Sequence, residues 1–595
     1  MRVKFKFVLL LPIVFSNISC SSSDKITFQT DDDTFETYYN DYYFMTDNSI
    51  YSEEIALASH AMALATFNDD EDYTKHSNYL RDLWKKEGFD LIHMSDSYYV
   101  KPETDSIGYG IAAKEVQLMG GSFTLVAIAV RGGNYDGEWA SNVTLGKEGN
   151  AQGFDEASDK VLNGLNDFLN NYSISGNIKI WISGYSRAAI TSNMVAGKIL
   201  NRLVEGEYLG NNVSYRDRDI FAYCFEPPMG VYASIENGRS QLYSGIHNLL
   251  NYNDIVPLVA PVEWGFTRYG VDHYYPDRLN DIFFDKSERE KLLSMYQFTY
   301  GSHNFPKYTV DEWEFFDVGE TIANEHNLPR ESIHPSQGRF SRAFIQEFAN
   351  VGVGSRQMWN QYVEDGIRDL MATIFGLNPK IDKIKIENLT KMIFEYDFIQ
   401  TMILEIQQDQ PSNFASDARL LFLQAFNATE ENMQDVSNLY MNLYPFLVMF
   451  GMAFKNRKDV LAQLFYRDNA MGLIIGHIPA LSYAFLKACD SRFNGDNACK
   501  LNDGNYYIFR IENPGEFSLM EKQLKKEVFS YKDGVMESSC LSAEKYADGH
   551  IDIYLPKNGQ YEYIVGNGGN LSLYNVDPLE KETPVNIALP LEGSF

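Results

Sequence analysis

The pattern of apolar and polar positions changes character several times along the chain. Residues 52–84 place apolar side chains at the spacing of a helix, with few residues that break helices. From Phe89 to about Pro261, short apolar runs alternate with helical stretches, and several of these runs are apolar throughout. Strands with this composition are buried on both faces, as in parallel sheets that are covered by helices. We therefore expect an α/β fold with a mostly parallel sheet.

Two regions with other patterns follow. Phe340 to about Phe485 has a helical pattern, and the apolar residues between 389 and 406 fall on one helical face. Asn505 to Phe595 instead holds short β-type runs separated by Asn, Gly and Pro turns. The predicted domains are an α/β core over 46–270, a largely helical insertion over 271–470, a segment over 471–500 that completes the core, and a small β-rich C-terminal domain over 501–595.

The first twenty residues have the organisation of an export signal. Arg2, Lys4 and Lys6 precede the short apolar stretch 8–15, and a small residue stands before Cys20. A cysteine at the cut resembles the signal of bacterial lipoproteins, in which the thiol carries a lipid. The resemblance implies a signal segment over 1–20 whose lipidated Cys20 becomes the mature N-terminus, and a polar tether over 21–45. The chain would then be anchored through its N-terminus to the membrane of the bacterial cell envelope. Residues 17 and 18 depart from the usual lipoprotein spacing, so secretion without an anchor remains the alternative.

Composition excludes several classes of protein. The 595 residues are 45% hydrophobic and 14% aromatic, which supports large cores and excludes a disordered chain or a small disulfide scaffold. The formal net charge is −30, from 51 Lys and Arg against 81 Asp and Glu, and such a surface repels phosphate backbones. We therefore expect no nucleic acid partner.

Cysteines and motifs give little sign of a cofactor or metal. Cys489 and Cys499 are near enough in sequence to close a loop in an exported protein, but the sequence leaves open whether they form a disulfide. The chain has no HExxH, no Cys/His spacing typical of zinc sites and no Gly-rich phosphate loop. We expect the protein to work without a cofactor.

The residues from Gly184 to Ala188 concentrate the chemistry. They read Gly-Tyr-Ser-Arg-Ala, after the β-type run 178–182 and before a stretch that favours a helix, 188–203. A nucleophilic serine on a sharp strand-to-helix turn needs small residues two positions before and after it, because the helix folds back against the strand. Ser186 is thus a candidate nucleophile, and the start of the following helix would direct the backbone N–H of Arg187 at a developing oxyanion.

An orienting acid and a base must come from elsewhere in the chain. In a parallel sheet they emerge at the carboxyl ends of later strands. Asp254 follows the strand-like run 246–252 directly, which makes it the candidate acid; the alternative is an aspartate that only forms the turn 254–257. Ten histidines compete for the role of base.

Several motifs in this order resemble the class 3 (fungal-type) lipases of the α/β-hydrolase fold. The resemblance spans about Gly108 to Tyr269 and is closest to a bacterial, exported branch. In that family a strand ends in Arg-Gly-Thr/Ser, an Asp-Trp and a His-x-Gly-Phe follow, and the serine turn and Asp-x-Val-Pro come later. The segments that correspond to these five motifs here are, in order, 131–133, Glu138-Trp139, 151–154, 184–188 and 254–257. The segment 264–270 follows them and extends the resemblance.

The resemblance implies roles for particular residues. Ser186 would be the nucleophile and Asp254 the acid, and the backbone N–H groups of Gly133 and Arg187 would form the oxyanion hole. Gly133 stands where the family prefers Thr or Ser, so a hydroxyl contribution to that hole would be absent. His477, just before a helix-like stretch similar to the one that follows the family's histidine, is the expected base; His303 is the second choice.

These residues predict a serine hydrolase that cleaves carboxylic esters, with a lipid or other acyl ester as substrate. The roughly 220 residues between acid and base would form a helical cap over the site or simply pack against the core. Two alternatives remain open at this point: an inactive hydrolase-fold lipoprotein that binds a partner at the surface, and an acyltransferase that uses the same three residues.

Overall fold

The structure is a computed structural model of the whole chain. It describes residues 23–30, 34–66, 73–100, 102–103, 106–132, 136–275, 337–350, 355–374, 378, 380–381, 419, 422–454, 457, 460, 476–495, 498, 500–523, 525–538, 543–545, 549–557, 559–566, 569–579 and 583–595. The predicted signal segment with Cys20 lies outside these residues, as do Gly133, His303, Cys499 and the segment 389–406.

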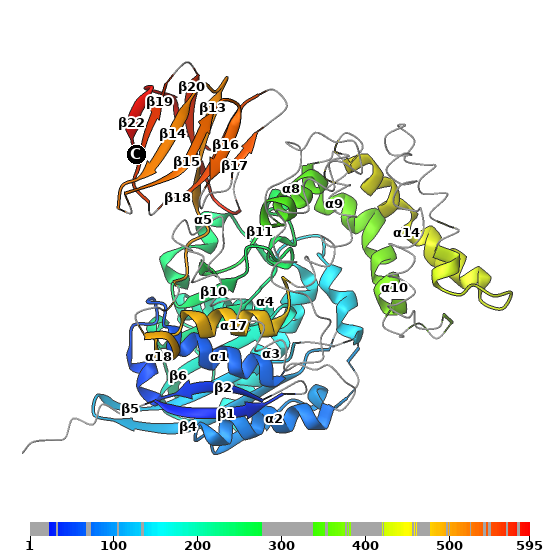
Figure 1. Cartoon of the computed structure of the whole chain (residues 1–595). Coiled ribbons are helices and arrows are strands. Elements are labelled where there is room, and N and C mark those ends of the chain that lie inside the picture. Colours follow the sequence, from blue (N-terminus) through cyan, green and yellow to red (C-terminus); the bar gives the residue numbers. More distant parts are fainter. Residues whose placement is uncertain are drawn as a thin grey trace, which may run out of the picture.

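An eight-stranded sheet forms the centre of the core (Figure 1). Its strand order is β12-β10-β8-β6-β5-β4-β3, and β7 pairs with β6. The strands from β5 to β12 are parallel, whereas β3 and β4 add an antiparallel edge. The bounds are β3 (Leu91–Met94), β4 (Tyr109–Leu118), β5 (Gly121–Val130), β6 (Gly176–Tyr185), β7 (Val213–Ser214), β8 (Ile220–Phe225), β10 (Ile246–Leu250) and β12 (Val271–Tyr274). The mostly parallel sheet that the apolar runs predict is confirmed.

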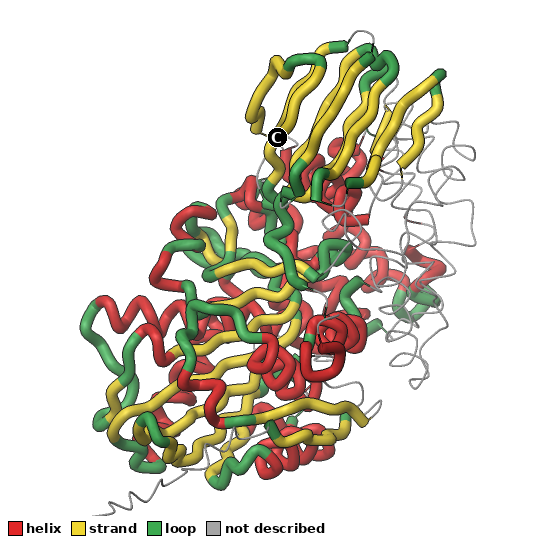
Figure 2. The backbone as a smooth tube through the Cα atoms, turned by 60° about the vertical axis from the view of Figure 1, so that its left-hand side comes forward, coloured by secondary structure: helices red, strands yellow, loops and turns green. Residues whose placement is uncertain are grey.

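Helices cover both faces of this sheet, as Figure 2 shows. On one face α3 (Gln152–Asn171) and α4 (Arg187–Val204) pack against Ile180 and Ile182 of β6. On the other face α1 (Glu53–Thr66) and α17 (Pro479–Cys489) pack against Trp181, and α2 (Tyr73–Lys86) packs on α1. The alternation of Ile180, Trp181 and Ile182 therefore places one hydrophobic core on each side of the sheet.

The prediction of a polar tether over 21–45 is wrong for its described residues. They form a hairpin, β1 (Asp24–Gln29) and β2 (Thr34–Tyr39), and a short 3-10 helix, η1 (Asp41–Met45). Phe28, Phe35 and Phe44 are buried in the same core as α1. Buried Ile26 and Phe28 in β1 and Phe35 and Tyr39 in β2 give the hairpin one largely apolar face, and burial of that face outweighs the polar character of the remaining residues.

The described part of the helical insertion consists of α8 (Gln337–Asn350), α9 (Arg356–Met358), a π-helical turn η10 (Trp359–Val363), α10 (Glu364–Ile374) and α14 (Met433–Phe454). Arg356 ties this unit to the core because its guanidinium donates to the backbone oxygens of Leu145, Gly146, Glu148 and Gly149. Among the described residues, no helix is both long and apolar enough to cross a membrane.

The C-terminal residues form a sandwich of two five-stranded antiparallel sheets, which lies at the top of Figure 1. One sheet has the order β17-β18-β13-β20-β21 and the other β16-β15-β14-β19-β22. The sandwich also packs on the core through Tyr506 and Tyr554, which share a cluster with Leu250 and Tyr274. The strands are β13 (Tyr506–Glu512), β14 (Phe517–Glu521), β15 (Lys526–Lys532), β16 (Val535–Ser538), β17 (Ala543–Lys545), β18 (Ile551–Pro556), β19 (Tyr561–Val565), β20 (Asn570–Val576), β21 (Thr583–Leu589) and β22 (Glu592–Ser594).

Three histidines of the core are held in the neutral form. His60 and His247 are fully buried and His273 is half-buried. Burial lowers the pKa of His60 to about 3, of His247 to about 4 and of His273 to about 3. Nε2 of His247 lies 2.8 Å from the backbone oxygen of Asn48 and its Nδ1 lies 3.0 Å from Nε2 of His273. The carbonyl requires a proton on Nε2 of His247, so its Nδ1 accepts from Nε2 of His273, and the His247 ring cannot gain a second proton without losing that hydrogen bond.

We expect acid to destabilise the fold well before its carboxylates are neutralised. The unfolded chain binds protons at these histidines below about pH 6.5, whereas the folded protein does not, so stability present above pH 6.5 is lost as the pH falls toward 4. Each histidine should lower the free energy of unfolding by up to about 1.4 kcal/mol per pH unit. Urea unfolding between pH 7.5 and 5 measures this, and His273→Gln, which keeps an N–H for His247, should show a shallower dependence. An unchanged dependence in this variant would contradict the assignment.

Candidate active site

Ser186 lies at a sharp turn between β6 and α4. Its backbone has φ 59° and ψ −125°, a left-handed conformation that a serine adopts only where its surroundings enforce it. A Cβ atom on Gly184 would lie 2.4 Å from the backbone oxygen of Ala188 and 2.8 Å from Oγ of Ser192. The small residue two positions before the serine is therefore a steric requirement, as the sequence pattern predicts.

The structure brings Ser186, His477 and Asp254 together. Oγ of Ser186 lies 2.8 Å from Nε2 of His477, and Nδ1 of that histidine lies 2.6 Å from Oδ2 of Asp254. A carboxylate only accepts hydrogen bonds, so Asp254 fixes the proton on Nδ1 and leaves Nε2 to accept from the serine hydroxyl. The three side chains thus form one continuous chain of hydrogen bonds with the polarity that a general base requires.

Burial differs along this chain of hydrogen bonds in a useful way. The Asp254 side chain is 0% exposed and the His477 side chain 20% exposed, while Ser186 as a whole residue is 8% exposed. The remaining oxygen of Asp254 accepts from the backbone N–H of Val256 at 2.9 Å. The acid is therefore shielded and fixed in orientation, and the histidine lies nearest to solvent.

The loop that presents His477 is fastened to the sheet at two points. The side-chain amide of Asn251 donates to the backbone oxygen of Gly476 at 3.0 Å, and the Tyr185 hydroxyl donates to that of His477 at 3.3 Å. Pro479 then begins α17, which packs on the sheet. Although His477 is 291 residues from Ser186, its backbone is held by the strand ends that carry the other two residues.

A buried ion network lies behind the predicted oxyanion hole. Arg131 donates to Glu138 at 2.7 Å, and Nε of Arg187 lies 3.7 Å from the other oxygen of the same carboxylate; the side chains are at most 1% exposed. The two guanidinium groups oppose the rise in the pKa of Glu138 that burial causes. Gly133 lies outside the described residues, but both flanks of its loop are fixed, and Arg187 is the first residue of α4.

Sequence reasoning missed one acidic residue beside the acid. Glu226 follows β8 directly, is 0% exposed, and contacts Asp254, Asn251 and Ser482. The signal that could have found it is the one used for Asp254: a carboxyl residue placed immediately after an apolar strand of the parallel sheet. Its contacts with Asp254, Asn251 and Ser482 could be learned only from the three-dimensional structure.

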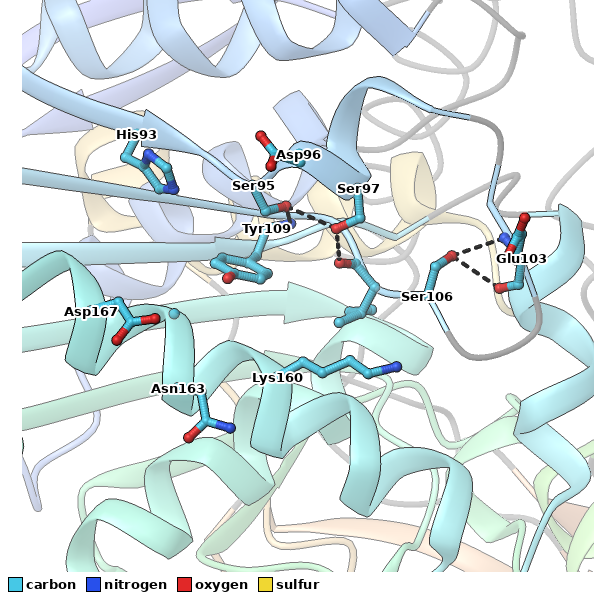
Figure 3. A pocket seen from close by; sticks show the side chains of 12 residues that line it. His93, Ser95, Asp96, Ser97, Glu103, Ser106, Tyr109, Lys160, Asn163 and Asp167 are labelled. Carbon is cyan, nitrogen blue, oxygen red and sulfur yellow. Dashed lines mark hydrogen bonds between the residues drawn. The ribbon is translucent and has the colours of Figure 1, made fainter.

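Other predicted features lie apart from this site. Cys489 is buried at the end of α17, and since Cys499 lies outside the described residues their disulfide stays a prediction. No group of three or more potential metal ligands occurs in the described part of the chain. A surface cavity of about 980 Å³, shown in Figure 3, is lined by residues of β3, β4 and α3 such as His93 and Lys160, and it contains none of the three hydrogen-bonded residues.

We expect loss of the Glu138 carboxylate to destabilise the core. Glu138→Gln leaves two buried guanidinium groups without their anion, which typically costs about 3–5 kcal/mol. The free energy of unfolding in urea measures the effect. Glu562→Gln, which removes an exposed pair with Lys522 in the sandwich, is the matched control and should cost less than about 1 kcal/mol. If the two variants lose the same free energy of unfolding, the buried ion network contributes no more to stability than an exposed ion pair.

Comparisons with known proteins find similarity only among solved structures, because no family model and no curated protein matches the sequence. The lipase of Rhizomucor miehei, in its native propeptide complex, covers 38% of this chain and 70% of its own at 16% identity, with a TM-score of 0.28. The triacylglyceride lipase of Rhizomucor miehei covers 38% and 82% at 16% identity, with a TM-score of 0.27. The lipase from Rhizopus microsporus var. chinensis covers 38% and 78% at 12% identity, with a TM-score of 0.25. Fungal lipases are thus distant structural neighbours of part of the chain.

Proposed function

We propose that this protein is a serine hydrolase that cleaves carboxylic esters, lipids among them, through an acyl-enzyme on Ser186. The observation that supports this most directly is the unbroken hydrogen-bonded chain from the Ser186 hydroxyl through His477 to the buried Asp254. A purely structural role does not require a strained serine, a polarised histidine and a shielded carboxylate in this order.

The chemistry follows from the direction of these hydrogen bonds. Oγ of Ser186 attacks the acyl carbonyl carbon while its proton moves to Nε2 of His477, and Asp254 stabilises the imidazolium that forms. When the tetrahedral intermediate collapses, His477 gives the proton to the departing alcohol oxygen. Water then attacks the acyl-enzyme with His477 again as base, which releases the acid and restores the serine.

The developing oxyanion needs donors that are fixed in advance. We assign this role to the backbone N–H groups of Arg187 and Gly133. Arg187 begins α4, where first-turn N–H groups have no acceptor within the helix, and the helix dipole favours negative charge there. The ion network of Arg131, Glu138 and Arg187 would hold the two donor segments at a constant separation.

We further propose that the helical insertion forms a cap beside the site. The unit contacts both loops that flank the three residues. Trp359 donates to the backbone oxygen of Val143, beyond the predicted oxyanion loop, at 2.9 Å. Arg342 donates to Glu263, beyond the acid loop, at 2.7 Å. A segment attached at both sides of the site is well placed to bound an acyl-chain pocket.

Replacing either partner of the central hydrogen bond should abolish activity. Ser186→Ala and His477→Ala remove the nucleophile and the base, so turnover of p-nitrophenyl and glyceride esters should fall by about 10⁴-fold or more. Ser186→Ala should also lose labelling by a fluorophosphonate probe. Ser214→Ala, at an exposed serine of β7, is the matched control and should keep both properties.

Two results would contradict the proposal. One is a wild-type protein that turns over no ester and takes up no probe, as an inactive binding protein would behave. The other is activity that survives in His477→Ala and is lost in His303→Ala. Product analysis with an added alcohol acceptor separates ester hydrolysis from acyl transfer by the same acyl-enzyme.

The proposed lipid anchor would hold the core close to the membrane. Because β1 begins at Asp24, only residues 21–23 separate Cys20 from folded structure, a span of about 10 Å when extended. We expect Cys20→Ala to move the protein from the membrane fraction to the soluble exported fraction without changing its specific activity. Cys540→Ala is the control and should leave the distribution unchanged; membrane retention of Cys20→Ala would refute lipidation at this residue.

A further inference from the structure

Glu226 occupies a strained and completely buried position beside the proposed acid. It follows the last residue of β8, its backbone φ is 51°, and it is 0% exposed. A non-glycine residue in the left-handed region costs of order 1–3 kcal/mol, and burying a carboxyl group adds to this cost. A glycine would avoid both costs, so the presence of glutamate here calls for a function.

The contacts of the Glu226 carboxyl fix it firmly. The backbone N–H of Asn251 donates to both oxygens, at 3.0 and 2.9 Å, and the Ser482 hydroxyl donates to Oε1 at 3.1 Å. The Asp254 carboxyl lies beside it, within reach of a hydrogen bond. Two carboxyl groups can share a hydrogen bond only if one of them carries a proton.

The surroundings decide which carboxyl carries the proton. Burial, and after it the negative charge of Asp254, raises the pKa of Glu226 well above its usual range. Asp254 is stabilised as the anion by the N–H groups of His477 and Val256. These contacts keep the proton on Glu226 and the charge on Asp254.

The other titratable groups described around Glu226 would not compensate a negative charge on its carboxyl group. Tyr185 at the end of β6 and Tyr275 after β12 both face it, and burial raises the pKa of each hydroxyl well above its usual range. His60 of α1 packs edge-to-face against the neighbouring Phe225 with ring centroids 4.6 Å apart, and burial lowers its pKa so that it is neutral. Of the described groups that act most strongly on Glu226, none carries a positive charge.

We propose that Glu226 is a positioning residue of the hydrolase, which as a neutral carboxylic acid donates its O–H to Asp254 and holds that carboxylate in line with His477. This inference rests on the proposed function. The hydrogen bond would fix the orientation of Asp254 without adding charge, so that Asp254 remains the single anion that faces the imidazolium. Ionisation of Glu226 at alkaline pH breaks this hydrogen bond and sets two anions against each other.

Two substitutions separate a neutral donor from a required anion. Glu226→Gln keeps a neutral N–H donor for Asp254 and an oxygen that can accept from Asn251 and Ser482, whereas Glu226→Leu keeps neither. We expect kcat of Glu226→Gln to lie within about 3-fold of the wild type near pH 7, and kcat of Glu226→Leu to fall about 10- to 100-fold with little change in KM. If Glu226→Gln is as slow as Glu226→Leu, or if both match the wild type, the proposal is wrong.

The pH profile supplies a readout that packing alone would not move. The wild type should lose kcat/KM on the alkaline side as Glu226 ionises, and Glu226→Gln should not show this loss. Glu87→Gln is the matched control, since Glu87 is also buried and burial raises its pKa, but it lies after α2 at the antiparallel edge of the sheet. Its alkaline profile should equal that of the wild type; the same alkaline loss in Glu226→Gln as in the wild type would overturn the proposal.

A stability measurement tests protonation even in the absence of turnover. The raised pKa of Glu226 means that its contribution to stability is complete at low pH and is lost as the pH rises from about 4.5 toward that pKa. Relative to the wild type, Glu226→Gln should therefore gain up to about tenfold in its folding equilibrium constant per pH unit between pH 5.5 and 8. A constant difference refutes a neutral Glu226, whereas a catalytically inert wild type with the expected divergence refutes only the proposed hydrolase.

Discussion

Hydrogen bonds between the carboxyl ends of three neighbouring parallel strands, β6, β8 and β10, hold the residues of the site in place. The backbone N–H of Ser186, just past β6, donates to the carbonyl of Phe225 on β8, and the N–H of Glu226, just past β8, donates to the carbonyl of Leu249 on β10. The next step runs in the other direction in sequence, since the N–H of Asn251 donates to the Glu226 carboxyl. Each strand end is thus held by the next, which sustains the left-handed backbone at positions 186 and 226.

The core deals with buried charge in two ways. On the nucleophile side, Glu138 lies between Arg131 and Arg187, so opposite charges compensate one another. On the acid side, none of the described groups that act most strongly on Glu226 is a cation, and a proton on Glu226, as proposed, would remove the second charge. His60 and His247 follow the second solution, since both are buried in the neutral form. Isolated buried charge is expensive, and each of these groups avoids it by pairing or by losing its charge.

Local physics explains which features the sequence could predict. The serine turn depends on a steric rule between residues two apart, and Asp254 is marked by its place after an apolar strand. The parallel strands are marked by unbroken apolar runs. His477 is different, because nothing in its immediate neighbours requires a base; resemblance to a family pointed to it, and the tertiary contacts of Tyr185 and Asn251 bring it to the strand ends.

Features that depend on distant contacts could not be predicted in this way. Residues 21–45 are polar and rich in Asp and Tyr, which predicts a tether. The partner that buries the apolar face of the hairpin, α1, is defined only once the chain has folded. The same holds for Glu226, whose carboxyl is buried beside Asn251 and Asp254 of one segment and Ser482 of another. A single carboxyl residue after a strand looks the same in the sequence whether it is an acid, a turn residue or a buried proton donor.

The anchoring of the helical insertion bears on how a substrate would reach the serine. Arg356 is engaged by backbone carbonyls of the 145–149 loop, and its guanidinium also lies 4.9 Å from the ring centroid of Phe266. Trp264, beyond the acid loop, packs on Trp359 with ring centroids 5.9 Å apart. If the insertion caps the site as proposed, its first helices are therefore part of a preformed wall rather than a detached lid, because opening there would leave an arginine and several carbonyls without partners.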